Sequence, residues 1–186
     1  MAVEIIKRRF SVDDYERMEQ TGILSEDDRV ELIDGEVVVM SPIGLPHLAC
    51  VDRMTRVLVL KLREHAIVRV QGSVVLDLYD APQPDVALLR PKADFYLSGH
   101  ANPTDILLLI EVADSSLAYD HEVKAPLYAS KGVAEYWLVD LNHEVITCYS
   151  DPSGGTYQIV TPHRRGESMA PRLLPDCALE INELLP

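Results

Sequence analysis

Ile106-Leu107-Leu108-Leu109-Ile110-Glu111-Val112 is the stretch of sequence that decides the fold. Its five consecutive aliphatic residues predict a buried core strand. Ser115-Ser116 then begins a segment that predicts a helix to about residue 131, where Gly132 is a typical helix stop. Pro126 must lie in the first turn of this helix or kink it. Residues 136–140 predict a second strand, which a helical connection of this length can bring back parallel to the first.

Further helix and strand patterns lie on both sides of this unit. Asp34-Gly35 is the two-residue signal of a tight hairpin between strands at 29–33 and 36–40. Apolar residues at three- and four-residue steps predict a long amphipathic helix over 46–65. The other predicted elements are a short helix at 11–20, strands at 67–70, 74–78 and 84–89, a hairpin of 145–149 with 157–160, and a turn at 181–185. The expected fold class is α/β in the mixed α+β sense, with a mixed β-sheet flanked by helices.

The composition indicates one globular domain, predicted over residues 1–186. Of the 186 residues 47% are hydrophobic, and 17 Lys and Arg against 30 Asp and Glu give a net charge of −13. No apolar run reaches the roughly 18 residues that cross a bilayer, and residues 1–10 lack the apolar region of a signal peptide. A cytoplasmic protein without membrane contact is therefore expected. Cys50, Cys148 and Cys177 lie too far apart for a CxxC metal knuckle or a disulfide framework.

The short motifs of several large enzyme classes are missing from the sequence. It contains no GxSxG elbow, no GxGxxG turn after a strand, no GxxxxGK phosphate loop and no HExxH. The six histidines are scattered, so a zinc site built from nitrogen ligands alone is not expected.

Two carboxylates at the ends of apolar strands are the unusual feature. Asp85 precedes the run 86–89, and Glu111 follows the run 106–110. A buried carboxylate without a partner costs several kcal/mol or has a raised pKa, so each needs a partner. One interpretation is structural: Asp85 caps a turn after Pro84, and Glu111 pairs with an arginine. The other is that both acids bind a divalent cation, for which carboxylate oxygens are suitable ligands.

Lys124 is the third residue of interest. It lies 13 residues after Glu111 (124 − 111 = 13), at the start of the helix that follows the strand, so its ammonium group can return to the strand end. A lysine in the first turn of a helix is most often solvated, and the helix dipole disfavours it slightly. A functional role would explain this placement.

The order of acid, acid and lysine on strand, strand and helix resembles the PD-(D/E)xK nuclease superfamily. Pro84-Asp85 supplies the first half of the motif, and Glu111-Val112-Ala113 supplies the second, with Ala113 where the superfamily pattern has Lys. Some branches of the superfamily place this lysine on the following helix. Lys124 is the matching candidate.

A closer resemblance is to the Uma-two family of restriction-endonuclease-like proteins, over about residues 10 to 150. Several short motifs carry it through their order and spacing. They are Glu31-Leu32-Ile33-Asp34-Gly35-Glu36, Met40-Ser41-Pro42 followed by His47, Pro84-Asp85-Val86, Ile110-Glu111-Val112, Asp120 with Lys124 and Tyr128, and Gly132-Val133-Ala134-Glu135-Tyr136-Trp137-Leu138-Val139-Asp140. Asp114-Ser115 stands where the family usually has Ser-Pro. The resemblance implies a restriction endonuclease-like core with a mixed β-sheet flanked by helices.

This resemblance also implies a metal-dependent DNA endonuclease. Asp85 and Glu111 would ligate Mg²⁺ or Mn²⁺, with a backbone carbonyl of Val112 or Ala113 as a further ligand. Lys124 would stabilise developing negative charge or orient the attacking water.

Two further positions acquire roles through the same resemblance. Glu31 would lie near the metal as a third acid, which completes a catalytic set of Asp85, Glu111, Lys124 and Glu31. His47 would contact a substrate phosphate or help to position water. For both residues a structural role is an equal alternative. Tyr128 is expected to pack under Lys124.

The acidic composition leaves other functions open. A nuclease must approach a polyanion, and the candidate for backbone contact is the dense basic patch on the predicted long helix, at Arg53, Arg56, Lys61 and Arg63. A solvated helix face explains this patch equally well. A catalytically degenerate binding or dimerisation module is the main alternative, and a hydrolase of a small phosphorylated molecule is a third. DNA is the expected partner of the leading hypothesis, and pairing into a homodimer is plausible.

Overall fold

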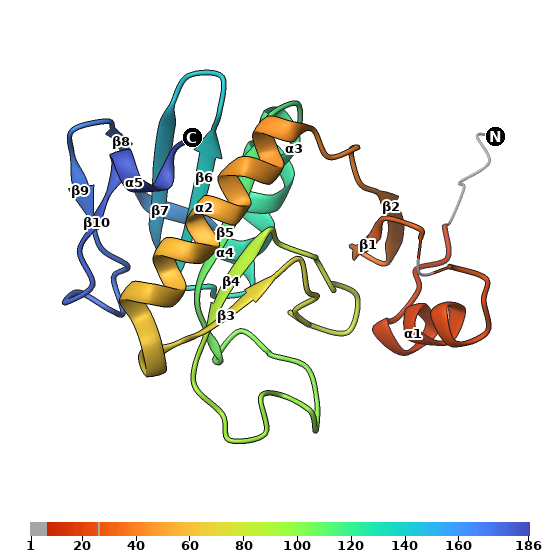
Figure 1. Cartoon of the computed structure of the whole chain (residues 1–186). Helices are drawn as coiled ribbons and strands as arrows, with labels where there is room; N and C mark the ends of the chain where they lie inside the picture. The colour runs from red at the N-terminus through yellow and green to blue at the C-terminus, as the bar shows by residue number, and fades with distance from the viewer. Residues whose placement is uncertain (1–6, 26) are drawn as a thin grey trace.

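The computed structural model describes residues 7–25 and 27–186 and has a six-stranded sheet at its centre (Figure 1). The strands, in spatial order, are β3 (Ile67–Val70), β4 (Val86–Leu89), β5 (Ile106–Ala113), β6 (Glu135–Asp140), β7 (Val145–Ser153) and β8 (Thr156–Arg164). Strands β5 and β6 are parallel and every other neighbouring pair is antiparallel. The predicted class, a mixed sheet flanked by helices, is confirmed, and so is the parallel return after the helical segment.

One face of the sheet is covered by the long helix α2 (Leu45–Leu62), which continues into the single turn η1 (Arg63–His65). Side chains alternate between the faces of a strand, so Leu108 and Ile110 of β5 join the core cluster of α2. Leu109 and Ala113 of the same strand belong to the cluster on the opposite face. The uninterrupted apolar run of β5 therefore reflects burial on both faces.

The opposite face is covered by a helical segment in three parts, α3 (Leu117–Tyr119), the π-helical turn η2 (Asp120–Lys124) and α4 (Ala125–Ser130). Pro126 is the second residue of α4 and lies in its first turn, as the sequence allowed. A proline within a helix lacks a donor and clashes with the carbonyl four residues earlier, and a wider turn relieves this crowding. Gly132, with φ +75°, follows the end of α4, as its sequence position predicted.

A separate two-stranded hairpin, β1 (Val30–Ile33) with β2 (Glu36–Val39), stands beside the main sheet (Figure 1). Asp34 and Gly35 form the predicted turn, with φ of 50° and 72°. The adjacent helix α1 (Val12–Gln20) begins at Ser11, whose side chain forms a capping box with Asp14.

The prediction of a strand at residues 74–78 is wrong. The segment is irregular, because its backbone donors bond to scattered partners: Val75 N to the Ala101 carbonyl and Leu76 N to the Asp80 carbonyl, each at 2.9 Å. Its apolar pattern arises instead from the burial of Val74 and Leu76 against the sheet.

The C-terminal region adds two short strands, β9 (Ser168–Met169) and β10 (Leu179–Glu180), and the helix α5 (Ile181–Leu184), which packs on α2. The sequence had predicted only a final turn here. Among the described residues, no helix combines the length and the apolar character needed to cross a bilayer.

Candidate active site

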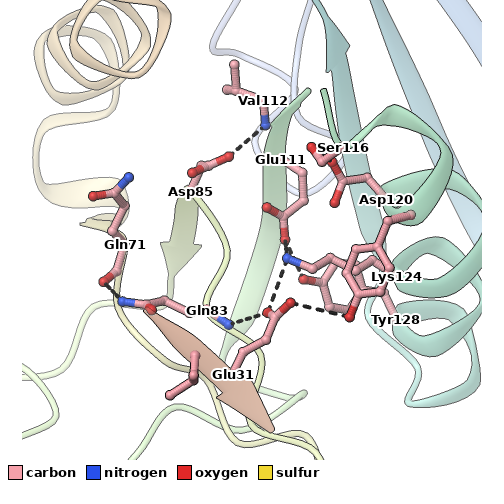
Figure 2. A network of polar contacts seen from close by, with 12 residues as sticks. Glu31, Gln71, Gln83, Asp85, Glu111, Val112, Ser116, Asp120, Lys124 and Tyr128 are labelled. Carbon is pink, nitrogen blue, oxygen red and sulfur yellow. Dashed lines mark hydrogen bonds and ion pairs between the residues drawn. The ribbon is translucent and has the colours of Figure 1, made fainter. Parts of the chain in front are cut away.

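A cleft of about 410 Å³ lies between the β1–β2 hairpin, the N-terminal end of α2 and the segment α3–η2. Acids from separate parts of the chain line it, and Figure 2 shows them around one lysine. The predicted residues Glu31, His47, Asp85, Glu111, Val112 and Lys124 all line this cleft. The structure thus brings these six predicted residues together in one place.

Asp85 is positioned by the pairing of β4 with β5. Val86 is opposite Ile110 in this antiparallel pair, so the residue before β4 lies beside the end of β5. Asp85 Oδ2 accepts a hydrogen bond from the Val112 amide at 2.8 Å and lies 3.0 Å from His47 Nε2. Asp85 is therefore bound to a neighbouring strand and to α2, and these contacts differ from the turn cap considered from sequence.

Glu111 pairs with Lys124 and with no arginine among the described residues. Lys124 Nζ lies 3.0 Å from Glu111 Oε1 and 3.2 Å from Glu31 Oε2, which joins β5, η2 and β1. Glu111 and Lys124 are each only 3% exposed. The ammonium group of Lys124 thus reaches the strand end, as its position along the chain predicted.

The π-helical turn arranges the polar residues of the helical segment. Ala125 N donates to the Asp120 carbonyl, five residues earlier, which is the π-type bond. Ser116, Asp120, Lys124 and Tyr128 follow one another at four-residue steps. The wider turn suits this spacing better than 3.6 residues per turn, and it directs the side chains of Asp120 and Lys124 toward the cleft (Figure 2).

Two tyrosine hydroxyl groups complete the network. Tyr128 is buried and donates to Glu111 Oε1 at 2.7 Å. It was expected only to pack under Lys124, so the hydrogen bond adds a polar role. Tyr119 donates to Glu31 Oε1 at 3.4 Å, and Glu31 Oε2 accepts from the Gln83 amide at 3.2 Å.

Burial and mutual attraction shift the pKa values in opposite ways. Burial raises the pKa of Glu111 well above its usual range, and the charge of Lys124 opposes this shift. Burial by itself would lower the pKa of Lys124, but attraction to Glu111, Glu31 and Asp120 outweighs it and raises that pKa. Burial also raises the pKa of Asp120. Lys124 is therefore a cation at neutral pH, held among carboxyl groups.

His47 in the first turns of α2 is 9% exposed. While Nε2 faces Asp85, Nδ1 is buried without a hydrogen-bond partner in the described part of the chain. Such an atom is uncommon and usually has a specific explanation, such as a role at a functional site.

The chemistry of the donors fits a magnesium-type ion. Within residues 7–25 and 27–186, no group of three or more His, Cys, Asp or Glu side chains is arranged to hold a metal ion. Magnesium, however, is commonly held by one or two carboxylates while it keeps several waters. Asp85 makes its hydrogen bonds through Oδ2 and Glu111 makes its own through Oε1, so each carboxylate retains a second oxygen as a ligand.

The basic patch predicted on the long helix does not line this cleft. A separate groove against α5 is lined by Arg53, Arg56 and Lys61. There Lys61 Nζ lies 3.8 Å from Glu183 Oε2. Arg63 follows the end of α2, far along the helix from His47.

Arg29 and Tyr119 also line the cleft, and sequence reasoning gave neither residue a role there. Arg29 precedes β1, and its Nη1 donates to the Ser41 carbonyl at 2.7 Å. For Tyr119 a signal existed, because it immediately precedes Asp120 in the four-residue series. For Arg29 no local pattern distinguishes it from an ordinary surface arginine.

A mixed sheet with two acids at the adjoining ends of β4 and β5 and a lysine on the following helix defines a protein of the restriction-endonuclease-like fold class. A family model described as "Uma2: Putative restriction endonuclease" matches residues 12–182. The chain belongs to this Uma2 family.

Comparison with solved structures agrees with this fold. A crystal structure described as "a putative nuclease belonging to DUF820" from Anabaena variabilis ATCC 29413 superposes with a TM-score of 0.71. The match covers 94% of this chain and 97% of the other at 15% sequence identity, a level at which the likeness concerns the fold. A comparison with curated proteins found no significant match.

Proposed function

We propose that this chain is a divalent-metal-dependent DNA endonuclease of the cytoplasm, which hydrolyses phosphodiester bonds through Asp85, Glu111 and Lys124. The observation that carries the proposal is the meeting of these residues in one cleft, with Lys124 Nζ 3.0 Å from Glu111. Members of the restriction-endonuclease-like family generally use divalent ions, which suits the carboxylate donors.

Asp85 and Glu111 would hold Mg²⁺ or Mn²⁺, with the backbone carbonyl of Val112 as a further ligand. The bound ion would supply positive charge to the phosphoryl group in the transition state and activate the attacking water. Contacts with neighbouring groups support this role by holding both carboxylates in place. The Val112 amide and His47 fix Asp85, and the Tyr128 hydroxyl group fixes Glu111.

Lys124 acts as a cation in this proposal. Its raised pKa keeps it protonated, so it donates hydrogen bonds to phosphoryl oxygens and does not accept a proton from water. Glu31 contacts Lys124 directly, and it serves to hold the ammonium group toward the cleft. Glu31 is thus a positioning residue for the lysine in this scheme.

His47 supports Asp85 through Nε2. Its imidazole lines the cleft, so a substrate phosphate or an ordered water can meet the buried Nδ1. This is the contact that the family resemblance implied for His47.

A plasmid-nicking assay tests the proposed function. Purified protein with Mn²⁺ or Mg²⁺ is expected to convert supercoiled plasmid to open circles, and EDTA is expected to stop this conversion. Asp85→Asn and Lys124→Ala should each abolish nicking. Asp52→Asn makes the same chemical change as Asp85→Asn on the exposed side of α2 and should retain full activity. Equal nicking by all four proteins would indicate contamination and reject the proposal.

A second candidate is a catalytically degenerate module that binds DNA or pairs into a homodimer. The observation that favours it is the position of the Lys124 ammonium group, which already neutralises Glu111 and Glu31. Metal binding without cleavage of either plasmid or single-stranded DNA would support this candidate. Cleavage of a small phosphomonoester instead of DNA would support a hydrolase of small phosphorylated molecules.

A further inference from the structure

We infer that the substrate of the proposed nuclease is an unpaired DNA strand and that intact duplex is a poor substrate. This inference rests on the proposed function and concerns which form of DNA the same cleft accepts. Three features of the cleft carry it: the depth of the acids, the apolar wall at its mouth and the scarcity of cations around it.

The acids and the lysine lie deep in the cleft. Asp85 is 6% exposed, and Glu111 and Lys124 are 3% exposed, beneath a cleft of about 410 Å³. The β1–β2 hairpin forms one wall, and α3 with the start of η2 forms the other. A phosphate must pass between these walls to reach Glu111. A strand without a partner can enter in this way, whereas a paired strand carries its complement against the walls.

The wall on the hairpin side includes an apolar stretch beside the polar residues Arg29, Glu31 and Ser41. Val39 at the end of β2 is 79% exposed, and Met40, Pro42 and Ile43 continue the lining toward α2. Such side chains cannot bind a phosphate, but they can contact the faces of bases. Bases turn their faces outward only when they are unpaired and unstacked.

Cations are scarce around the cleft. Among the described lining residues, only Arg29 and Lys124 carry a permanent positive charge, and Lys124 is paired with two acids. Contacts of lysine and arginine to phosphates contribute more to the binding of duplex than of a single strand, because duplex has the higher charge density, so few cations limit duplex binding more strongly. The guanidinium group of Arg29, at the edge of the cleft, can meet one phosphate of a single strand.

The direct test compares three substrates of one sequence with Mn²⁺: a labelled single strand, the same strand in a full duplex, and a duplex with a central unpaired bubble. Unpairing a base costs a few kcal/mol, so we expect the single strand to be cut at least about tenfold faster than the duplex. In the bubble substrate, cuts should fall within the unpaired nucleotides. Equal or faster cutting of the duplex would overturn this inference and leave the proposed nuclease function intact. Failure to cut any of the three would reject both.

A matched pair of variants tests the apolar wall. Val39→Asp places a negative charge where the bases are expected, so it should raise the KM for the single strand several-fold without changing the melting temperature. Val160→Asp makes the same change at a 52% exposed position of β8, outside the cleft, and should leave the KM unchanged. Equal KM values for Val39→Asp and the wild type would reject the role of this wall. So would an equal rise in KM for both variants.

Discussion

The two faces of the six-stranded sheet share the same strands but differ in their side chains. Toward α2, the core is mostly aliphatic, with Leu58, Leu108 and Ile110 among its buried members, and Trp137 is its one buried aromatic side chain among the described residues. Toward α4, the core includes the tyrosines 128, 136, 149 and 157, and it borders the buried carboxylates and the ammonium group of the cleft. Successive residues of β5 point alternately to one face and to the other.

This difference indicates that one face of the sheet mainly stabilises the fold, while the other face borders the candidate active site. Burying an aliphatic side chain contributes about 1.5–3 kcal/mol, so the face toward α2 stabilises the fold. Burying charged groups costs several kcal/mol per ion before pairing, so the cleft is tolerated only through its internal contacts. Such an arrangement keeps carboxylates and lysine in fixed positions for a cation and a phosphate.

The largest expected effect follows removal of the buried cation. Lys124→Met leaves Glu111 and Glu31 without their partner, which should lower the free energy of unfolding by about 3–5 kcal/mol at neutral pH. The double variant Lys124→Met with Glu111→Gln should recover part of this stability but no activity. Lys61→Met removes an exposed lysine that lies 3.8 Å from Glu183 and should cost at most about 1 kcal/mol. Urea denaturation measures the free energy of unfolding of all three variants. Equal decreases for Lys124→Met and Lys61→Met would contradict a special role for the buried cation.

A cavity in the aliphatic face should act on stability alone. Met54 is fully buried, so Met54→Ala should lower the free energy of unfolding by about 2–5 kcal/mol. The folded protein should retain the catalytic rate of the wild type at low temperature. Val59→Ala, at a half-exposed position of the same helix, should change stability by less than about 0.5 kcal/mol. Loss of activity in fully folded Met54→Ala would break the distinction between the faces.

The loss of metal affinity and cleavage at acidic pH, called here the acidic limb of the pH profile, should follow the protonation of Glu111. Burial raises the pKa of this carboxyl group, and a metal ligand must be deprotonated. As the pH is lowered, metal affinity and cleavage should therefore fall before the pH reaches 4.5, the ordinary pKa of a glutamate. Deprotonation of Lys124 should cause no loss of activity below pH 10.5, because the pKa of Lys124 is raised above this ordinary value for a lysine. Isothermal titration with Mn²⁺ across the pH range measures the limb, and a midpoint at or below 4.5 would be contrary to this expectation.

The smallest effect concerns one hydroxyl group. The Tyr128 hydrogen bond favours the ionised form of Glu111, so Tyr128→Phe should move the acidic limb to higher pH. Tyr157→Phe also removes a buried hydroxyl group, one that donates to the Val133 carbonyl at 2.9 Å, and should leave the limb in place. Identical shifts in both variants would show that the limb does not report Glu111.

Local patterns predicted most of the sheet and the order of its elements. The apolar run of β5, the hairpin at Asp34-Gly35 and the helical return to β6 depend on neighbouring residues, so the sequence contains their signals. The strand predicted at residues 74–78 was wrong because burial of Val74 and Leu76 against the sheet produces the same apolar pattern as a strand.

The candidate site was predictable in its members but not in its contacts. The apolar strands around Asp85 and Glu111 made these acids conspicuous. The pairing of Lys124 with Glu31 and of His47 with Asp85 joins residues 93 and 38 positions apart (124 − 31 = 93, 85 − 47 = 38), and no local pattern encodes such contacts. The position of Val39 in the wall of the cleft depends on how the hairpin packs beside the sheet, and no local pattern encodes this packing.

The central claim is that Asp85 and Glu111 hold one divalent ion beside Lys124, and anomalous diffraction from crystals soaked in Mn²⁺ tests it most directly. The account predicts one anomalous peak in the cleft, within about 2.5 Å of an oxygen of each carboxylate. Saturating Mn²⁺ with no peak at these two side chains, in crystals of the intact protein, would contradict it.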